Sequence, residues 1–507
     1  MAHERIRLIA TSDVHGTIYA HDYAVGKEID QGFAKISTLV RYLKDENTLL
    51  LDNGDVLEGS ALTTYHYNKR SEDISPVTDV MREMKYNYVN VGNHDFNYGE
   101  HALMMHLQNV GAPCLTSNWF YHKKPYGPTY AVEEIAGLKI AIFGIVTHYI
   151  PHWERKANIR DSRFVDAFKA AKSAIDKIKK FENPDIIVCM YHGGFERDLQ
   201  NGYLTEADTG ENIGYKILKE LGDIDILITG HQHRSLCGKL GNTVYTQTAA
   251  NGEEVAVIDI YVDNKAIDAR ILKTETPEDK KILKYAEKEE AECQEWLDTT
   301  LGIMKNDLVI EDEFDARLHK SQVITFLNQV QRDATGADLS SCALFTGATG
   351  FKHEIKVRDL VGTYVYPNTL VVKKITGKIL REYLERCAEF WTVRAENIAV
   401  TTRFEVPKPQ YYNYDMVDGV EYTIKVSNPI GKRIVSLTYN GEEVTDDMEF
   451  TLALNNYRAG GGGDFEMIKA APTVGQTTSS MVDLLIKYIS KHEVIEFEPV
   501  NNITVIR

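Results

Sequence analysis

A length of 507 residues exceeds what one hydrophobic core usually organises, so two domains are expected. The formal net charge of −17 argues against a protein that binds long nucleic acid or a membrane surface, because such proteins usually carry a basic face. The positive charge that binds an anionic substrate would therefore have to be concentrated at one site, and bound metal ions could supply it.

The N-terminus and the cysteines indicate the compartment. The sequence opens without a basic segment followed by a long apolar one, and no run of about 18 apolar residues occurs. The six cysteines form no C-x-x-C pair, which favours free thiols. We expect a cytoplasmic protein without a membrane span, with an exported protein that has lost its signal peptide as the alternative. The oligomeric state is not indicated.

Short apolar segments alternate with longer helical patterns from Arg5 to about Thr274. Strands are predicted over Arg5–Thr11, Thr48–Leu51, Tyr88–Val91, Lys139–Ile145, Asp185–Met190 and Asp225–Thr229. Helices are predicted over Phe33–Glu46, Pro76–Met84, Glu100–Val110, Phe164–Phe181 and Ile213–Leu221. This alternation predicts a layered α/β domain over residues 1–275.

The composition changes after this domain. Pro277–Leu301 alternates acidic and basic residues after a proline, which predicts a solvated connecting helix within residues 276–305. Residues 306–507 predict a smaller α+β domain. Helices are expected at His319–Thr335 and Lys378–Trp391, and strands at Val420–Val426, Ile434–Tyr439 and Phe450–Asn455. A further element is expected at Thr369–Thr376.

Polar residues follow five of the six predicted strands of the first domain. They are Asp13-Val14-His15-Gly16, Asn53-Gly54-Asp55, Gly92-Asn93-His94-Asp95, His192-Gly193-Gly194 and Gly230-His231-Gln232-His233. In open α/β sheets, ligands bind beyond the carboxyl ends of the strands. The sequence therefore predicts one site built from five loops.

The residue types in these loops are typical of metal ligands. Asp13 and His15 are spaced i, i+2, as are His231 and His233, so in an extended chain the members of each pair would point the same way. With Asp55, Asn93 and His192 they supply seven O or N ligands and no thiolate, which suits two divalent ions sharing the Asp55 carboxylate. Such a pair clamps the attacking and leaving oxygens of a phosphoryl displacement.

Each motif alone has an ordinary explanation. A single D-x-H or a Gly-Asp turn occurs by chance, and a histidine after a strand is more often hydrogen-bonded than ligating. Their occurrence in order, each just after a strand, favours the metal site. The other eleven histidines, including His101, His106, His148 and His152, are assigned to the surface or to helices.

Together these motifs resemble the calcineurin-like metallophosphoesterases. The resemblance implies a four-layer domain in which two packed mixed sheets are flanked by helices. It implies one metal held by Asp13, His15, Asp55 and His233, and the other by Asp55, Asn93, His192 and His231. Suitable ions are Mn, Zn, Fe or Co. Catalytic roles are implied for His94, as the acid beside the phosphate, and for Asn93; Asp95 is considered as a partner for His94.

Two stretches of the second domain carry aromatics suited to stacking a nucleobase, Tyr364–Leu370 and Asn455–Phe465. Taken singly, they are more simply a core strand and a flexible glycine loop. With Tyr412–Tyr422, however, they resemble the C-terminal domain of the 5'-nucleotidase family, in particular its 2',3'-cyclic-nucleotide 2'-phosphodiesterase/3'-nucleotidase branch. That resemblance implies base stacking by Tyr366 and Tyr457, and Asn368 and Asp359 are further candidates. The family's N-G-G-G-I-R motif is replaced by Thr346-Gly347-Ala348-Thr349-Gly350-Phe351-Lys352.

The predicted function is metal-dependent opening of nucleoside 2',3'-cyclic phosphates and hydrolysis of the resulting 3'-nucleotides. A 5'-nucleotidase or nucleotide-sugar hydrolase on the same scaffold is the first alternative, and an inactive nucleotide-binding protein is a distant one. The expected partner is a nucleotide substrate. Asn97 stands where 5'-nucleotidases commonly carry an aspartate beside the catalytic histidine, so the partner of His94 is left open.

Overall fold

The computed structural model describes residues 4–205, 208–366, 368–492, 494–496 and 499–507. The chain divides into two compact units, Met1–Gln294 and Glu295–Arg507. The division falls inside the helix α8 (Glu287–Leu297). Among the described residues, no helix combines the length and the apolar composition that crossing a bilayer requires. The compartment of the protein stays a prediction.

The first unit is built around two mixed sheets. The five-stranded sheet has the order β14 (Ile267–Lys273), β13 (Glu254–Tyr261), β1 (Arg5–Thr11), β2 (Thr48–Asp52), β3 (Tyr88–Val89). The six-stranded sheet has the order β11 (Leu236–Leu240), β12 (Thr243–Gln247), β10 (Ile226–Thr229), β9 (Ile186–His192), β7 (Leu138–Val146), β6 (Ala131–Ile135). The predicted strands are present, with ends that differ by a few residues.

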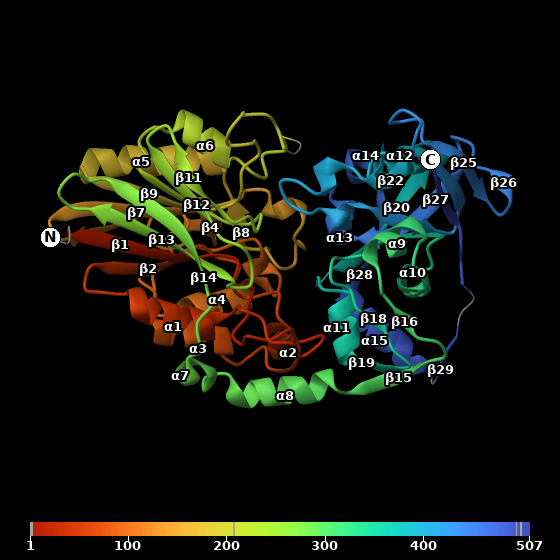
Figure 1. The fold of residues 1–507 in the computed structure, drawn as a ribbon, viewed down its shortest axis with the longest axis horizontal. Helices are drawn as coiled ribbons and strands as arrows, with labels where there is room; N and C mark the ends of the chain where they lie inside the picture. The colour runs from red at the N-terminus through yellow and green to blue at the C-terminus, as the bar shows by residue number, and fades with distance from the viewer. Residues whose placement is uncertain (1–3, 206–207, 367, 493, 497–498) are drawn as a thin grey trace. The chain divides into compact units, whose positions relative to one another are not determined.

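The two sheets pack face to face through aliphatic side chains, among them Leu8, Leu49, Ile140 and Val188, all buried. Helices α5 (Ala167–Phe181) and α6 (Gly214–Glu220) cover the outer face of the second sheet, on the side opposite α1 (Phe33–Leu43) and α3 (Pro76–Met84) (Figure 1). The predicted four-layer arrangement of two sheets flanked by helices is confirmed.

Local sequence explains where the main helices begin and how they pack. In α5 the Asp166 side chain accepts the Lys169 N–H at the N-terminus. Residues Ala167, Ala171, Ala174, Ile175 and Ile178 are buried, which is the spacing of one helical face.

Parallel pairing brings the functional loops to common edges. β1 pairs in parallel with β2, and β2 with β3. In the second sheet, β9 lies between β7 and β10 and is parallel to both. Because parallel strands end at the same edge, the loops after β1, β2 and β3 lie together, as do those after β9 and β10.

The second unit is centred on a five-stranded sheet with the order β23 (Asp415–Asp418), β17 (Leu339–Ala343), β27 (Glu449–Asn455), β20 (Thr369–Thr376), β28 (Thr473–Ser480). Helices α10 (Gln322–Thr335), α12 (Gly377–Ala388) and α15 (Met481–Lys491) pack around it on a large apolar core. Ser321 begins α10 as its N-cap, and Gly336 ends it in a left-handed conformation with φ of 67°. A second sheet contains β24 (Glu421–Lys425) and β25 (Ile434–Tyr439).

Two predicted helices differ from the structure. The connecting segment forms two helices, α7 (Lys280–Leu283) and α8, and a strand, β15 (Thr300–Met304), begins where the helix was expected to end. Asp279 rather than the proline begins α7, because its side chain accepts the Lys281 N–H. The segment is also less solvated than predicted, since Cys293 is fully buried. The predicted helix Lys378–Trp391 ends at Ala388, and Trp391 begins a strand.

Candidate metal centre

The predicted ligands sit on sharply turned loops. Five of them have left-handed backbone: Asp13 (φ 57°), His15 (52°), Asp55 (59°), His231 (67°) and His233 (55°). This conformation is uncommon for residues with a side chain and concentrates at functional sites. The expected extended backbone at the i, i+2 pairs is wrong, because the chain turns at every one of these ligands. Asp13 and His15 nevertheless converge in one cluster, whereas His231 and His233 belong to two different clusters.

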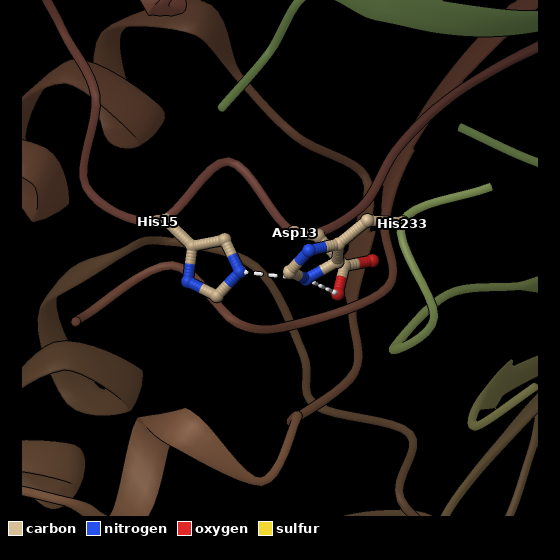
Figure 2. Close-up of side chains that lie close together, drawn as sticks. All are labelled: Asp13, His15 and His233. Atoms are coloured by element: carbon tan, nitrogen blue, oxygen red, sulfur yellow. Dashed lines mark hydrogen bonds and ion pairs between the residues drawn. The ribbon is translucent and has the colours of Figure 1, made fainter. Parts of the chain in front are cut away.

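The first ligand cluster consists of Asp13, His15 and His233. Figure 2 shows the His233 ring between the other two side chains. Its Nε2 atom lies 3.0 Å from His15 Nε2 and 3.3 Å from Asp13 Oδ1. Two loops far apart in sequence thus supply one group of possible ligand atoms.

The second cluster consists of Asp55, His192 and His231. His192 Nε2 lies 3.1 Å from Asp55 Oδ2, and the side chains of both residues are fully buried. Apart from this mutual contact, neither of the two atoms has a hydrogen-bond partner among the described residues. Asn93 adjoins the cluster, with its Oδ1 atom 2.7 Å from His231 Nδ1.

Buried polar atoms without hydrogen bonds are rare and call for an explanation. A divalent cation held by Asp55 and His192 would give both atoms a partner and offset the cost of burying them. The ligand set of carboxylate, imidazole and amide groups without thiolate suits Mn, Zn, Fe or Co. The residues present therefore fit a divalent metal pair.

Hydrogen bonds fix which ring nitrogen of each histidine faces the centre. His15 Nδ1 donates to the Glu58 carbonyl at 2.8 Å, and His192 Nδ1 donates to the Asn53 carbonyl at 2.7 Å. Both rings therefore turn Nε2 toward the ligand clusters. His231 is held the other way round, because its Nε2 lies 2.9 Å from Glu211 Oε1 and leaves Nδ1 beside Asn93. Such outer partners orient ligating histidines and raise their basicity.

The charges at the site reinforce one another. Burial acts to raise the pKa of Asp13, but His192 and His233 hold it below its ordinary value. Burial likewise opposes ionisation of Asp55, yet His192 and His94 lower its pKa. Burial lowers the pKa of His192, whereas Asp55 and Asp13 raise it to about 9. Both carboxylates are thus ionised at neutral pH, as ligands must be.

His94 lies at the edge of the centre, and its side chain is 27% exposed. Its Nδ1 atom lies 2.7 Å from Asn97 Oδ1 and 3.2 Å from Glu58 Oε2. Desolvation lowers its pKa, but the charges of Asp55 and Glu58 more than offset this and raise it to about 10. Cations bound nearby would oppose that rise.

Asp95 does not face His94. Its carboxylate accepts backbone N–H groups of Asp55 (2.9 Å), Val56 (2.8 Å), Leu57 (3.1 Å) and Gly92 (2.8 Å). These bonds tie the loop after β2 to the loop after β3. Its described contacts are those of a residue that holds Asp55 in place, and a catalytic role for Asp95 stays untested.

Sequence reasoning missed three acidic residues of the site. Glu58 follows Asp55 by three residues, so a polar side chain on the same turn was the available signal. Glu154 bonds Asn97, and Glu211 bonds His231. Both come from loops without a recognisable motif, and only the folded chain brings them to the site.

The candidate substrate residues lie in the second unit. Tyr366 is 37% exposed and packs edge-on against Phe345, at a ring distance of 5.0 Å. Tyr457, in the short helix α13 (Asn456–Ala459), lies edge-on to Tyr412 at 6.4 Å. The Thr369 N–H donates to Asn456 Oδ1, so the segment after Tyr366 and the helix carrying Tyr457 adjoin.

The remaining two candidates are engaged in local structure. Asn368 accepts the Met481 N–H through its backbone carbonyl. Asp359 accepts the Lys356 N–H and caps α11 (Val357–Thr363), so its carboxylate already has a structural partner. Pro367, between Tyr366 and Asn368, lies outside the described residues. The roles of all four candidates stay predictions.

Two family models match the chain in the same order as the two units. Calcineurin-like phosphoesterase matches residues 6–235, and 5'-nucleotidase, C-terminal domain, matches residues 301–470. Both matches agree with the family inferred from the motifs.

Individual relatives are similar over nearly the whole chain. A 2',3'-cyclic-nucleotide 2'-phosphodiesterase/3'-nucleotidase of Salmonella typhimurium is 26% identical over 92% of this chain and 84% of its own length. Trifunctional nucleotide phosphoesterase protein YfkN of Bacillus subtilis is 24% identical over 98% of this chain, which spans only 38% of YfkN.

A solved Staphylococcus aureus structure, provisionally assigned as a 5'-nucleotidase, is 31% identical and has a TM-score of 0.93. The match covers 99% of this chain and 100% of the other. With the motifs, the fold and the ligand clusters, these matches show that the chain belongs to the calcineurin-like phosphoesterases that carry a 5'-nucleotidase C-terminal domain.

Proposed function

We propose that this chain hydrolyses nucleoside 2',3'-cyclic phosphates to 3'-nucleotides and then removes the 3'-phosphate. The observation that carries the phosphoesterase chemistry is the pair of ligand clusters beside His94. The choice of substrate is supported by relatives named for both activities, of which the Salmonella protein is 26% identical over most of the chain.

In this proposal Asp13, His15, Asp55 and His233 hold one divalent ion, and Asp55, Asn93, His192 and His231 hold the other. Divalent ions held there would neutralise phosphoryl oxygens and lower the pKa of an attacking water. The chain's own part is to present the inward nitrogens of His15, His192 and His231 in fixed orientations, through the bonds described above.

His94 supplies the proton in the leaving-group step. Water adds to phosphorus and releases one proton to solvent, the P–O2' bond of the cyclic ester breaks, and its electron pair goes to the ribose oxygen, which takes a proton from His94 Nε2. His94 then regains a proton from solvent, so the cycle consumes no net proton. The second cycle breaks the P–O3' bond in the same manner. His94 Nδ1 already faces Asn97 and Glu58, so Nε2 is the nitrogen left for the substrate.

A panel of substrates tests the proposed function. Enzyme loaded with Mn, Zn or Co would be assayed for phosphate release from 3'-AMP and 5'-AMP, and for 3'-AMP formation from 2',3'-cyclic AMP. We expect the cyclic and 3' substrates to be used with a kcat/KM at least about tenfold above that for 5'-AMP. A preference for 5'-AMP would overturn the proposal.

Such a preference would instead support the second candidate function, a 5'-nucleotidase. That alternative is favoured by the Staphylococcus aureus structure, which is 31% identical over 99% of this chain. The two functions share the metal centre and differ only in which ribose oxygen leaves.

Base stacking is tested at Tyr457. Tyr457→Ala should raise KM for nucleotides by roughly tenfold, because a stacked base contributes about 1–3 kcal/mol. It should leave KM for p-nitrophenyl phosphate, which has no nucleobase, within a factor of two. Tyr42→Ala is the control, since Tyr42 lies on α1 with 74% exposure. Equal effects on both substrates would remove Tyr457 from base binding.

A further inference from the structure

The His94 ring is held by the side chains of Asn97 and Glu58, and Asn97 stands in place of the aspartate that 5'-nucleotidases commonly carry there. Asn97 Oδ1 is 2.7 Å from His94 Nδ1, and Glu58 Oε2 is 3.2 Å from the same nitrogen. Both are oxygen acceptors when Glu58 is ionised, so they stabilise the form of His94 that carries a hydrogen on Nδ1.

The orientation of the Asn97 amide is fixed by a third residue. Asn97 Nδ2 donates to Glu154 Oε2 at 2.6 Å. The other Glu154 oxygen accepts the Asn158 Nδ2 (2.8 Å) and the Arg155 N–H (2.7 Å). A carboxylate can only accept, so it selects the amine side of the Asn97 amide and leaves Oδ1 for His94.

Glu58 links the two functional regions of the site. Its side chain is 5% exposed. Its carbonyl accepts the His15 Nδ1–H, and its carboxylate lies against His94. One residue on the loop after β2 therefore contacts both a predicted metal ligand and the predicted acid.

We propose that Glu58 is the carboxylate partner of His94, and that Asn97, oriented by Glu154, sets which ring nitrogen faces the substrate. All three are positioning residues, because they act on the phosphate ester only through His94. The inference rests on the proposed function, in which His94 Nε2 delivers its proton to the leaving oxygen.

The two other acids near His94 have other partners. The Asp95 carboxylate is saturated by four backbone N–H groups. Asp55 accepts the backbone N–H of His94 at 2.7 Å and lies in the second ligand cluster, so its carboxylate is committed to the metal centre. Among the described acids near His94, Glu58 is the one that contacts the ring and serves no ligand cluster.

Leaving-group dependence distinguishes a positioning role from a structural one. A ribose oxygen needs a proton to depart, whereas p-nitrophenolate departs without one, so proton delivery matters only for the nucleotide. Glu58→Gln and Asn97→Ala should each lower kcat for 3'-AMP by about 100-fold. Both should lower kcat for p-nitrophenyl phosphate by less than about threefold.

A conservative substitution and a matched control complete the experiment. Asn97→Asp combined with Glu154→Gln should retain most of the 3'-AMP activity, because the aspartate carboxylate can accept the His94 Nδ1–H and the amide introduced at position 154 can donate to its other oxygen. Glu196→Gln is the control: Glu196 is a buried acid of the same unit, and its carboxylate accepts the Tyr215 and Lys216 N–H groups. It should leave the ratio of the two activities unchanged. The bound metal, measured by mass spectrometry, should remain at the wild-type level in every variant.

Equal losses on both substrates, or loss of metal in Glu58→Gln, would overturn the inference and assign Glu58 a structural role. Should Glu58→Gln fold poorly, the comparison of Asn97→Ala with the Asn97→Asp, Glu154→Gln double variant still decides, because the inference requires the double variant to retain 3'-AMP activity that Asn97→Ala loses. Failure of the proposed function looks different. In that case the wild type itself prefers 5'-AMP, and the same ratio is then measured with 5'-AMP in place of 3'-AMP.

Discussion

Replacing Gly92 with alanine should move the Asp55 carboxylate, which both predicted metals share. A Cβ atom at Gly92 would lie 2.1 Å from Asp55 Oδ1 and 2.6 Å from the Asp55 backbone nitrogen. Carbon does not approach such atoms closer than about 3 Å, so the carboxylate must shift by about 1 Å. A misplacement of that size costs roughly 100-fold in rate. We expect kcat for phosphate release to fall by about this factor and the bound metal to decrease.

Gly222→Ala is the matched control, because a Cβ atom there meets no heavy atom within 4 Å. It should keep kcat within about twofold, since surface substitutions away from special features change stability by less than about 0.5 kcal/mol. The readouts are steady-state kinetics, metal content by mass spectrometry and the unfolding midpoint. Wild-type kcat and metal content in Gly92→Ala would refute the placement of Asp55 at the centre.

Two further predictions concern stability. His106 is buried, its Nδ1 lies 2.8 Å from Thr78 Oγ1, and burial lowers its pKa from 6.5 to about 4. The unfolded chain therefore binds more protons between these values, so the stabilisation is complete above pH 6.5 and is lost as the pH falls to about 4. Between pH 6.5 and pH 4 the free energy of unfolding should therefore fall by about 3 kcal/mol on account of His106. Denaturant unfolding at several pH values should show this contribution in the wild type and not in His106→Asn. Lys320→Met should cost roughly 3–5 kcal/mol, because it leaves the Asp418 carboxylate buried without its cation. Lys320→Met with Asp418→Asn should restore much of the loss, and a double variant as unstable as the single one would contradict this account.

The repeated strand-and-loop pattern made the first unit predictable. Buried strands such as β1 and β9 are nearly continuous runs of apolar residues, and a polar motif follows each of them. Sequence order predicted that Asp13 and His192 would share a site at one sheet edge. The two side chains do lie 4.0 Å apart, but β1 and β9 belong to different sheets, so it is the packing of the two sheets that brings them together. The structure brings all the predicted ligands together in two clusters and Asn93 beside them.

The backbone at the ligands was not predictable from spacing. An i, i+2 pair suggests a strand, but Asp13 and His15 both adopt left-handed φ values. That conformation depends on bonds from other loops, such as the His15 N–H to the Asp55 carbonyl. The break between α7 and α8 is local instead, because hydrogen bonds between residues three apart, such as that from the Ala286 N–H to the Leu283 carbonyl, replace the α-helical pattern there.

The way each histidine is held leads to a last prediction. His15 and His192 are oriented by main-chain carbonyls, which no side-chain substitution removes. His231 is oriented by the Glu211 carboxylate instead. Glu211→Ala should therefore weaken only the metal position that includes His231, by about 10–100-fold, because outer partners of ligating histidines contribute about that much affinity.

A metal titration monitored by calorimetry measures the affinity of each metal position directly and does not depend on turnover. The wild type should bind two ions, whereas Glu211→Ala should bind one with wild-type affinity and the other more weakly. Glu196→Ala serves as the control, because it removes a buried acid whose carboxylate accepts the Tyr215 and Lys216 N–H groups. Two ions bound with unchanged affinities in Glu211→Ala would mean that the His231 ring is held by its loop alone. Weakening of both ions together would mean instead that the Asp55 bridge, and not the orientation of each histidine, governs metal affinity at this centre.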